Sequence, residues 1–257
     1  MINLINDDCL NAMNSIEDNF IDLVITSPPY DNIRDYNNSS EWNFDIFKKI
    51  ANQLIRILKK GGVIVWIVND ATIKGSETGT SFKQALYFKE IGLNLHDTMI
   101  YYKNSYPFPC SNRYYQNFEY MFVFCKGKLK TANLIKVPTI SKTKNSTFRK
   151  KDGTTTKFKY EINKPLRNAD NVWKYEVGYQ KSTTDKIAYN HPAIFPEKLT
   201  KDHIITWSNE NDLIFDPMMG SGTVGKMAKI LNRNFIGIEI DNEYFKIAEN
   251  RINSASI

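Results

Sequence analysis

The chain has 257 residues, of which 42% are hydrophobic and 24% charged, as in a soluble globular protein with one large α/β domain and a small insertion. It has no apolar run near the ~20 residues that span a membrane, and residues 1–8 do not resemble a secretory signal, so we expect a cytoplasmic protein without a membrane partner. Three scattered cysteines and three histidines without zinc-ligand spacing argue against a disulfide framework and against a metal site.

The patterns along the chain alternate between strand and helix. In chain order they predict a strand at 2–5, a short helix at 10–16, a strand at 21–26, a helix at 44–58, a strand at 63–68, a helix at 80–91 and strands at 97–102 and 120–125. After a gap they predict a strand at 213–215, a helix at 222–231, a strand at 235–240 and a helix at 243–252. This alternation predicts a doubly wound, mostly parallel α/β sheet.

The gap in this pattern is basic. Residues 126–190 hold 16 lysines and arginines against 5 acidic residues, a net charge of +11, whereas the rest of the chain carries −5. The stretch is polar and weakly periodic, so we interpret it as a loop-rich insertion between 1–125 and 191–257, which together form the main domain. A polyanion is the natural partner of such a stretch, and a solvated lysine-rich loop is the alternative.

A glycine-rich turn, Phe215-Asp216-Pro217-Met218-Met219-Gly220-Ser221-Gly222-Thr223, joins a predicted strand to a helix. It is neither a dinucleotide fingerprint nor a P-loop, because it lacks the third glycine and the Gly-Lys-Ser/Thr of those motifs. The acid Asp216 suits a cationic ligand such as S-adenosylmethionine. Glu239 ends the next strand, where a nucleotide fold places the acid that binds ribose hydroxyls. A purely structural turn and a surface glutamate are the alternative.

A second turn, Ser27-Pro28-Pro29-Tyr30, directly follows the predicted strand at 21–26. Active sites of open α/β sheets lie at the carboxyl ends of the strands, and the two prolines stiffen the backbone there. The serine hydroxyl and the Pro28 carbonyl could accept hydrogen bonds from an amino group, and the tyrosine ring could stack on a base. A strand-ending proline turn without a functional role is the alternative.

Four motifs together resemble the amino-directed DNA methyltransferases. Residues 26–30 (TSPPY) resemble their catalytic motif, 215–223 (FDPMMGSGT) their cofactor motif, 235–241 (FIGIEID) the strand that ends in the ribose-binding acid, and 191–199 (HPAIFPEKL) the segment before the cofactor motif. The catalytic motif precedes the cofactor motif, which is the order of the β group of this family.

The resemblance implies a Rossmann-like, seven-stranded sheet that binds S-adenosylmethionine, with residues 126–190 as the target-recognition region. Met218 stands where phenylalanine is usual, and an adaptable apolar side chain should serve equally well. The implied catalytic residues are Ser27, Pro28, Pro29 and Tyr30. Within the basic stretch, Arg149, Lys150 and Lys151 are adjacent and carry three charges, so they are the candidate DNA-binding residues, with a solvated loop as the alternative. The implied cofactor-binding residues are Asp8, Cys9, His191, Pro192, Ala193, Phe195, Asp216, Pro217, Met218, Gly220, Ser221, Gly222, Thr223, Glu239 and Ile240.

The implied reaction is methyl transfer to the exocyclic amino group of a base flipped out of duplex DNA. Ser27 and the Pro28 carbonyl would accept the two N–H bonds, and Tyr30 would stack on the base. Tyr36, Trp42 and Tyr106 are candidates for further walls of the base pocket, with core packing as the alternative for each.

Several alternatives stay open. Serine at the first motif position favours cytosine N4 within the family, and adenine N6 is the alternative. Pro109-Cys110 superficially matches a cytosine carbon-5 methyltransferase, but no glutamine follows it and the motif order differs. A methyltransferase acting on RNA or protein and a non-catalytic DNA-binding module are the remaining readings. Beyond double-stranded DNA, we keep open a cognate restriction endonuclease and a homodimer as partners.

Overall fold

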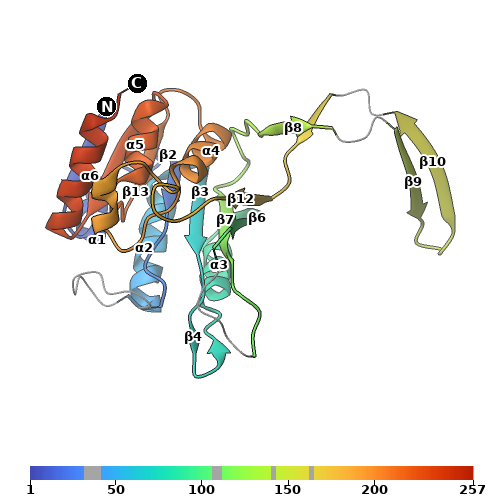
Figure 1. The fold of residues 1–257 in the computed structure, drawn as a ribbon, viewed down its shortest axis with the longest axis horizontal. Helices are drawn as coiled ribbons and strands as arrows, with labels where there is room; N and C mark the ends of the chain where they lie inside the picture. Colours follow the sequence, from blue (N-terminus) through green and yellow to red (C-terminus); the bar gives the residue numbers. More distant parts are fainter. Residues whose placement is uncertain (32–41, 106–111, 140–142, 162–164, 257) are drawn as a thin grey trace. The chain divides into compact units, whose positions relative to one another are not determined.

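The computed structural model of the chain describes residues 1–31, 42–105, 112–139, 143–161 and 165–256. It divides into two compact units, one formed by Met1–Asn133 with Asn171–Ile257 and the other by Leu134–Asp170. The larger unit holds a single large sheet between two layers of helices (Figure 1).

The large sheet has eight strands in the order β1-β14-β13-β2-β3-β7-β6-β12. Within the described chain, β7 runs antiparallel to its neighbours β3 and β6, and all the other pairs are parallel. The doubly wound, mostly parallel sheet is therefore confirmed. Its strands are β1 (Ile2–Asn6), β2 (Ile21–Thr26), β3 (Leu58–Val68), β6 (Asn94–Lys103), β7 (Phe118–Cys125), β12 (Val172–Tyr175), β13 (Leu213–Asp216) and β14 (Asn234–Glu239).

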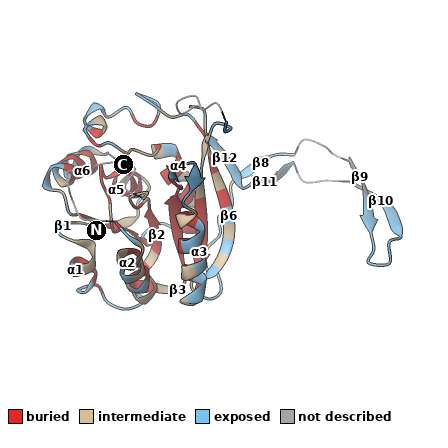
Figure 2. Ribbon diagram, turned by 90° about the horizontal axis from the view of Figure 1, so that it is seen from below, coloured by how far each residue is buried: buried red, intermediate tan, exposed pale blue. Residues whose placement is uncertain are grey.

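Helices cover both faces of this sheet (Figure 2). One layer contains α1 (Cys9–Met13), α2 (Phe44–Ile57) and α3 (Thr80–Glu90), and the other contains α4 (Glu197–Trp207), α5 (Thr223–Ile230) and α6 (Asn242–Ser254). Along β2, Val24 packs into the first layer, whereas Leu23 and Ile25 pack into the second. Both faces are buried, which explains why the strands read as continuous apolar runs rather than alternating ones.

The eighth strand corrects the expected count of seven. The seven expected strands are present, and β12 extends the sheet by pairing with β6, Trp173 opposite Tyr101. Strand β12 lies inside the stretch that we expected to be a loop-rich insertion. On the other side of that stretch, the Asn133 side chain donates a hydrogen bond of 3.2 Å to the carbonyl of Ser208. Residues 126–133 and 171–190 therefore belong to the larger unit, and the separate unit is shorter than 126–190.

Helix α4 was not predicted from the sequence. Its buried face carries polar side chains, with Thr200, His203 and Thr206 at most 1% exposed, so the apolar periodicity is weak. The indole of Trp207 donates to Nδ1 of His203 at 3.2 Å, and burial lowers the pKa of His203 to about 3. The ring is therefore neutral, and it belongs to the core.

The smaller unit consists of two antiparallel strand pairs. Strand β8 (Lys136–Pro138) pairs with β11 (Leu166–Asn168), and β9 (Thr143–Arg149) pairs with β10 (Thr155–Glu161). The remaining elements belong to the larger unit: the two-stranded hairpin of β4 (Thr72–Ile73) and β5 (Ser76–Glu77), and the 3₁₀ helix η1 (Lys186–Asn190). Among the described residues, no helix is both long and apolar enough to cross a bilayer.

Two glycines with similar backbone angles test how tightly the cofactor turn is packed. Gly222 (φ +77°) would place a Cβ 2.8 Å from Cα of Ala248 on α6, whereas Gly75 (φ +80°) has no atom within 4 Å of that position. Gly75→Ala should cost only the positive-φ penalty of roughly 1 kcal/mol, and Gly222→Ala should cost about 1–3 kcal/mol more because α6 must shift. Urea unfolding of the two variants measures this difference, and equal free energies of unfolding would contradict the packing argument.

Candidate active site

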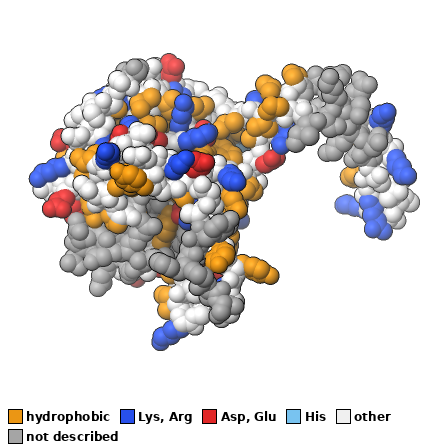
Figure 3. All heavy atoms as spheres, in the orientation of Figure 1, with side chains coloured by type: hydrophobic (Ala, Val, Ile, Leu, Met, Phe, Trp, Pro, Cys, Tyr) orange, Lys and Arg blue, Asp and Glu red, His pale blue; other side chains and the backbone are white. Residues whose placement is uncertain are grey.

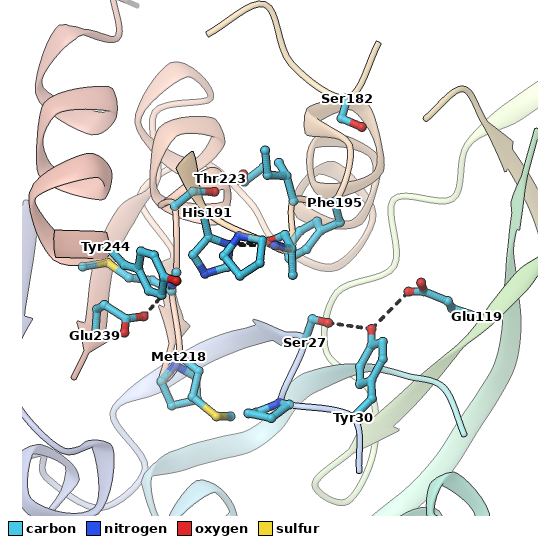
Figure 4. Close-up of a pocket in the computed structure, with 18 of the residues that line it drawn as sticks. Ser27, Tyr30, Glu119, Ser182, His191, Phe195, Met218, Thr223, Glu239 and Tyr244 are labelled. Atoms are coloured by element: carbon cyan, nitrogen blue, oxygen red, sulfur yellow. Dashed lines mark hydrogen bonds between the residues drawn. The ribbon is translucent and has the colours of Figure 1, made fainter. Parts of the chain in front are cut away.

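A cavity of about 580 Å³ lies at the carboxyl edge of the parallel strands. Residues that follow β1, β2, β13 and β14 line it, so the two turns singled out in the sequence meet at one place. Figure 4 shows Glu239 and Tyr244 at one side of this cavity and Ser27, Tyr30 and Glu119 at the other. The expected site residues that line it are Asp8, Cys9, Ser27, Pro29, Tyr30, His191, Pro192, Ala193, Phe195, Pro217, Met218, Gly220, Ser221, Thr223, Glu239 and Ile240.

The carboxylate of Glu239 is fixed by backbone amides at the end of β14. One oxygen accepts a hydrogen bond of 2.8 Å from the Gly220 amide, and the other accepts one of 2.9 Å from the Asp241 amide. Burial raises the pKa of Glu239, and these amides oppose that shift. The carboxylate is held rigidly at the cavity wall and keeps free lone pairs, which can accept hydrogen bonds from the hydroxyl groups of a ribose.

The glycine turn approaches the imidazole ring of His191 closely. A Cβ on Gly220 would lie 2.8 Å from Nε2 of His191, and the backbone of Gly220 has a positive φ of +50°. The ring of His191 also contacts Tyr244 edge-on, at 4.4 Å between centroids. Only glycine fits at position 220, and the two rings form one side of the cavity.

Three expected site residues do not line the cavity: Pro28, Asp216 and Gly222. The Asp216 side chain is 1% exposed; it accepts a hydrogen bond of 3.1 Å from the Met218 amide. Burial raises the pKa of Asp216 to about 7. The turn therefore folds over Asp216 and uses it to hold its own backbone, and an ion pair between Asp216 and a ligand cation stays a prediction.

Asp8 and Cys9 lie at the cavity end of α1. The Asp8 carboxylate caps the helix by accepting from the amides of Leu10 (2.8 Å) and Asn11 (3.2 Å). Burial, together with the charges of Asp8 and Glu239, raises the pKa of the Cys9 thiol to about 12. The thiol therefore stays protonated and does not act as a nucleophile.

At the other end of the cavity, four polar side chains form a chain of hydrogen bonds, and Figure 4 shows three of them, Ser27, Tyr30 and Glu119. The hydroxyls of Ser27 and Tyr30 are 2.7 Å apart, and the Tyr30 hydroxyl donates to Oε2 of Glu119 at 3.0 Å. The other carboxylate oxygen of Glu119 is 2.9 Å from Nζ of Lys103. Tyr30 thus contributes a polar hydroxyl as well as the aromatic ring that the sequence suggested.

Several lining residues were missed in the sequence. Glu119 and Lys103 lie on strands of the sheet, and Tyr244 lies on the last helix, outside the two recognised turns. The missed residues include Tyr101, Lys103, Ser105, Glu119, Val177, Gly178, Tyr179, Ser182, Tyr189 and Tyr244. The sequence did contain a signal for two of them: Lys103 directly follows the apolar run 97–102, and Glu119 directly precedes the apolar run 120–125.

The outer aromatic candidates have different outcomes. Trp42 lines the cavity and is 8% exposed. Tyr36, Tyr106 and Cys110 lie outside the described residues.

The candidate DNA-binding residues lie in the smaller unit. Arg149 ends β9, and Lys150 and Lys151 follow it in the turn of the hairpin, all three exposed. In the described ranges, no group of three or more histidine, cysteine or acidic side chains could hold a metal ion.

The cofactor turn is anchored by a buried ion-pair network. The guanidinium of Arg251, 1% exposed, donates to Ser221 Oγ at 3.2 Å, Asp185 at 3.0 Å and Glu197 at 2.9 Å. Lys226 on α5 bonds to the same two carboxylates, each at 2.8 Å. Burial opposes ionisation of Asp185, but its hydrogen bonds from Lys226 and Arg251 prevail and lower its pKa.

The chemistry of the cavity fits S-adenosylmethionine. Among the described residues, three acidic side chains, Asp8, Glu119 and Glu239, line it against one lysine, Lys103, so this part of the wall is complementary to a ligand with two cationic groups. The close approach of Gly220 to His191 leaves no room for a side chain at position 220. A mostly parallel sheet with such a site at its carboxyl edge fits the class of S-adenosylmethionine-dependent methyltransferases.

Comparison with known proteins identifies the family. A family model described as DNA methylase, for the N6- and N4-methyltransferases, matches residues 21–250, and the chain belongs to this family. It is 54% identical to the orphan methyltransferase M.BamHII of Bacillus amyloliquefaciens over 244 residues, 93% of this chain and 91% of that protein. The protein is thus a DNA methyltransferase that uses S-adenosylmethionine and acts on an amino group of cytosine or adenine.

Solved structures show the same fold. The M1.HpyAVI–SAM complex matches with a TM-score of 0.65 at 25% identity, over 98% of this chain and all of that one. The cytosine-N4-specific PvuII DNA methyltransferase matches with a TM-score of 0.73 at 20% identity, over 100% of this chain and 88% of that one.

Substitution of Asp216 distinguishes its role in the turn from a direct ion pair with the cofactor. Asparagine keeps an oxygen that can accept from the Met218 amide, whereas alanine leaves that amide unsatisfied. We therefore expect Asp216→Asn to retain the affinity for S-adenosylmethionine within about threefold and Asp216→Ala to lose roughly tenfold or more. Calorimetric titration measures both affinities. If the asparagine variant binds as weakly as the alanine variant, the negative charge itself is required.

Proposed function

We propose that this enzyme methylates N4 of cytosine in duplex DNA, on a base flipped out of the helix. The observation that carries the proposal is the Ser27 hydroxyl, which lines the cavity and is held by Tyr30 at 2.7 Å. An exocyclic amino group is a weak nucleophile because its lone pair is delocalised into the ring. A hydroxyl oxygen that accepts a hydrogen bond from one N–H of this group favours a pyramidal nitrogen, whose lone pair is no longer delocalised into the ring.

When bound, S-adenosylmethionine supplies an electrophilic methyl group. The residues around Glu239 and His191 would hold this cofactor, and those around Ser27 and Tyr30 would hold the base (Figure 4). Binding both in one cavity replaces a bimolecular encounter by an oriented contact, which accounts for much of the acceleration. The Ser27 oxygen stabilises the positive charge that develops on the amino nitrogen.

Cytosine is preferred over adenine on the identity of Ser27. Serine at this motif position favours cytosine within the family, whereas aspartate or asparagine favours adenine.

A base inside duplex DNA cannot reach a cavity at the edge of a sheet unless it leaves the stack. The aromatic side chains Tyr30 and Trp42 line the cavity and would stack on the extruded base.

The hairpin β9–β10 supports a role in DNA binding. Residues paired across an antiparallel ladder share a face, and the register pairs Arg149 with Thr155 and Thr147 with Lys157. Lys159, two residues after Lys157, lies on this same face, so the face is basic. Figure 3 shows basic side chains, in blue, on the surface of this hairpin. A two-stranded ribbon with a basic face fits the major groove and its phosphates.

Product analysis tests the target. Duplex DNA incubated with enzyme and methyl-labelled S-adenosylmethionine is digested to nucleosides and separated by mass, with RNA and protein as parallel substrates. We expect label in N4-methyldeoxycytidine and none with Ser27→Ala. Label in N6-methyldeoxyadenosine would overturn the choice of base. Label only in RNA or protein, or cofactor binding without transfer, would overturn the substrate or the activity.

The salt dependence of binding tests the DNA contacts of the hairpin. Replacing Arg149, Lys150 and Lys151 with alanine should weaken duplex binding and reduce the slope of log affinity against log salt by roughly one unit per lost phosphate contact. The affinity for S-adenosylmethionine should not change. The control replaces three exposed lysines of the larger unit, Lys89, Lys201 and Lys246, and so removes the same charge. Equal slopes for the two triple variants would mean that the hairpin triplet does not contact DNA.

A further inference from the structure

The hydrogen bonds from Ser27 to Glu119 run in one direction. Oε1 of Glu119 pairs with the Lys103 ammonium at 2.9 Å, and an ionised carboxylate can only accept hydrogen bonds. The single proton of the Tyr30 hydroxyl therefore points to Oε2 of Glu119, at 3.0 Å. Tyr30 has no second proton to give to Ser27, so in the 2.7 Å contact between these hydroxyls Ser27 is the donor.

This direction prepares Ser27 for its substrate. With its own proton donated to Tyr30, Ser27 Oγ keeps its two lone pairs as acceptors for an amino N–H. The same three groups also form an unbroken path from the Ser27 hydroxyl to a carboxylate, with contacts of 2.7 Å and 3.0 Å. All of them line the cavity, and Glu119 is largely shielded, with its side chain 15% exposed.

We propose that Tyr30 and Glu119 form the proton exit of the methyl-transfer reaction, an inference that rests on the proposed amino-group substrate. The amino nitrogen forms its bond to the methyl carbon while the carbon–sulfur bond breaks, its electron pair remaining on sulfur. The nitrogen then carries a positive charge and must lose one proton. That proton passes to Ser27 Oγ, the Ser27 proton passes to Tyr30 Oη, and the Tyr30 proton passes to Oε2 of Glu119. Glu119 ends neutral, and every other group regains its starting form.

Lys103 sets the resting state of this path. Its ammonium contacts the carboxylate oxygen that Tyr30 does not use, so it holds the Glu119 carboxylate in place without blocking the acceptor oxygen. Lys103 therefore acts as a positioning residue for Glu119. Tyr101, opposite Glu119 in the β6–β7 register, is 3% exposed, and its ring centroid lies 5.9 Å from Nζ of Lys103.

Conservative variants test the path. Tyr30→Phe keeps the ring and removes the hydroxyl, and Glu119→Gln keeps an oxygen acceptor for Tyr30 and removes the charge. We expect each to lower the single-turnover methylation rate by roughly 10- to 100-fold, with affinities for S-adenosylmethionine and duplex DNA near wild type. The double variant should be no slower than the slower single variant, because both changes interrupt one path. Tyr87→Phe is the control, because it removes a tyrosine hydroxyl on α3, outside the cavity.

The outcomes separate this inference from the function on which it rests. A wild-type enzyme that transfers no methyl group to DNA refutes the proposed function. A wild-type enzyme that does transfer it, with Tyr30→Phe and Glu119→Gln within twofold of its rate or with independent, multiplicative losses in the double variant, overturns the proton path. If Glu119→Gln fails to fold, as judged by lost cofactor binding, the rate of Tyr30→Phe alone decides in the same way.

Discussion

Arg251 is the residue on which the geometry of the cofactor turn depends. Its guanidinium is 1% exposed and lies between the glycine turn at Ser221 and the carboxylates of Asp185 and Glu197. A buried cation requires such partners, and removing one member of a buried pair typically costs ~3–5 kcal/mol. The network thereby ties three segments that are remote in sequence: the segment after the smaller unit, the start of α5 and the last helix. Ser221, the neighbour of Gly220, is thus held directly by Arg251.

The fold and half of the active site could be predicted because they follow local rules. Continuous apolar runs marked the buried strands, and the turns around Ser27 and Gly220 lay where parallel strands end. Glu119 escaped this reasoning because it lies near the beginning of its strand. Strand β7 runs antiparallel, so its first residues reach the same edge as the last residues of β2. Only the strand direction, a tertiary property, shows that Glu119 and Ser27 face one cavity.

Other errors have similar physical causes. Helix α4 buries Thr200, His203 and Thr206, and a buried face with polar side chains gives little apolar periodicity. Strand β12 is only four residues long and partly exposed, so it could not be told from a loop until its backbone was seen to pair with β6. The burial of Asp216 was not predicted because charge is visible in a sequence, whereas the direction in which a turn folds over a side chain is not.

The pairing of β2 with β13 has a consequence for how the enzyme acquires its structure. Ile214 lies opposite Leu23 in this ladder, so the catalytic and cofactor turns become neighbours only when segments about 190 residues apart meet. Bringing such distant segments together costs loop-closure entropy before the contacts contribute to stability. Topologies rich in such contacts fold slowly. Neither turn can acquire its partner from local structure alone. Binding competence therefore arises late, as a property of the assembled sheet.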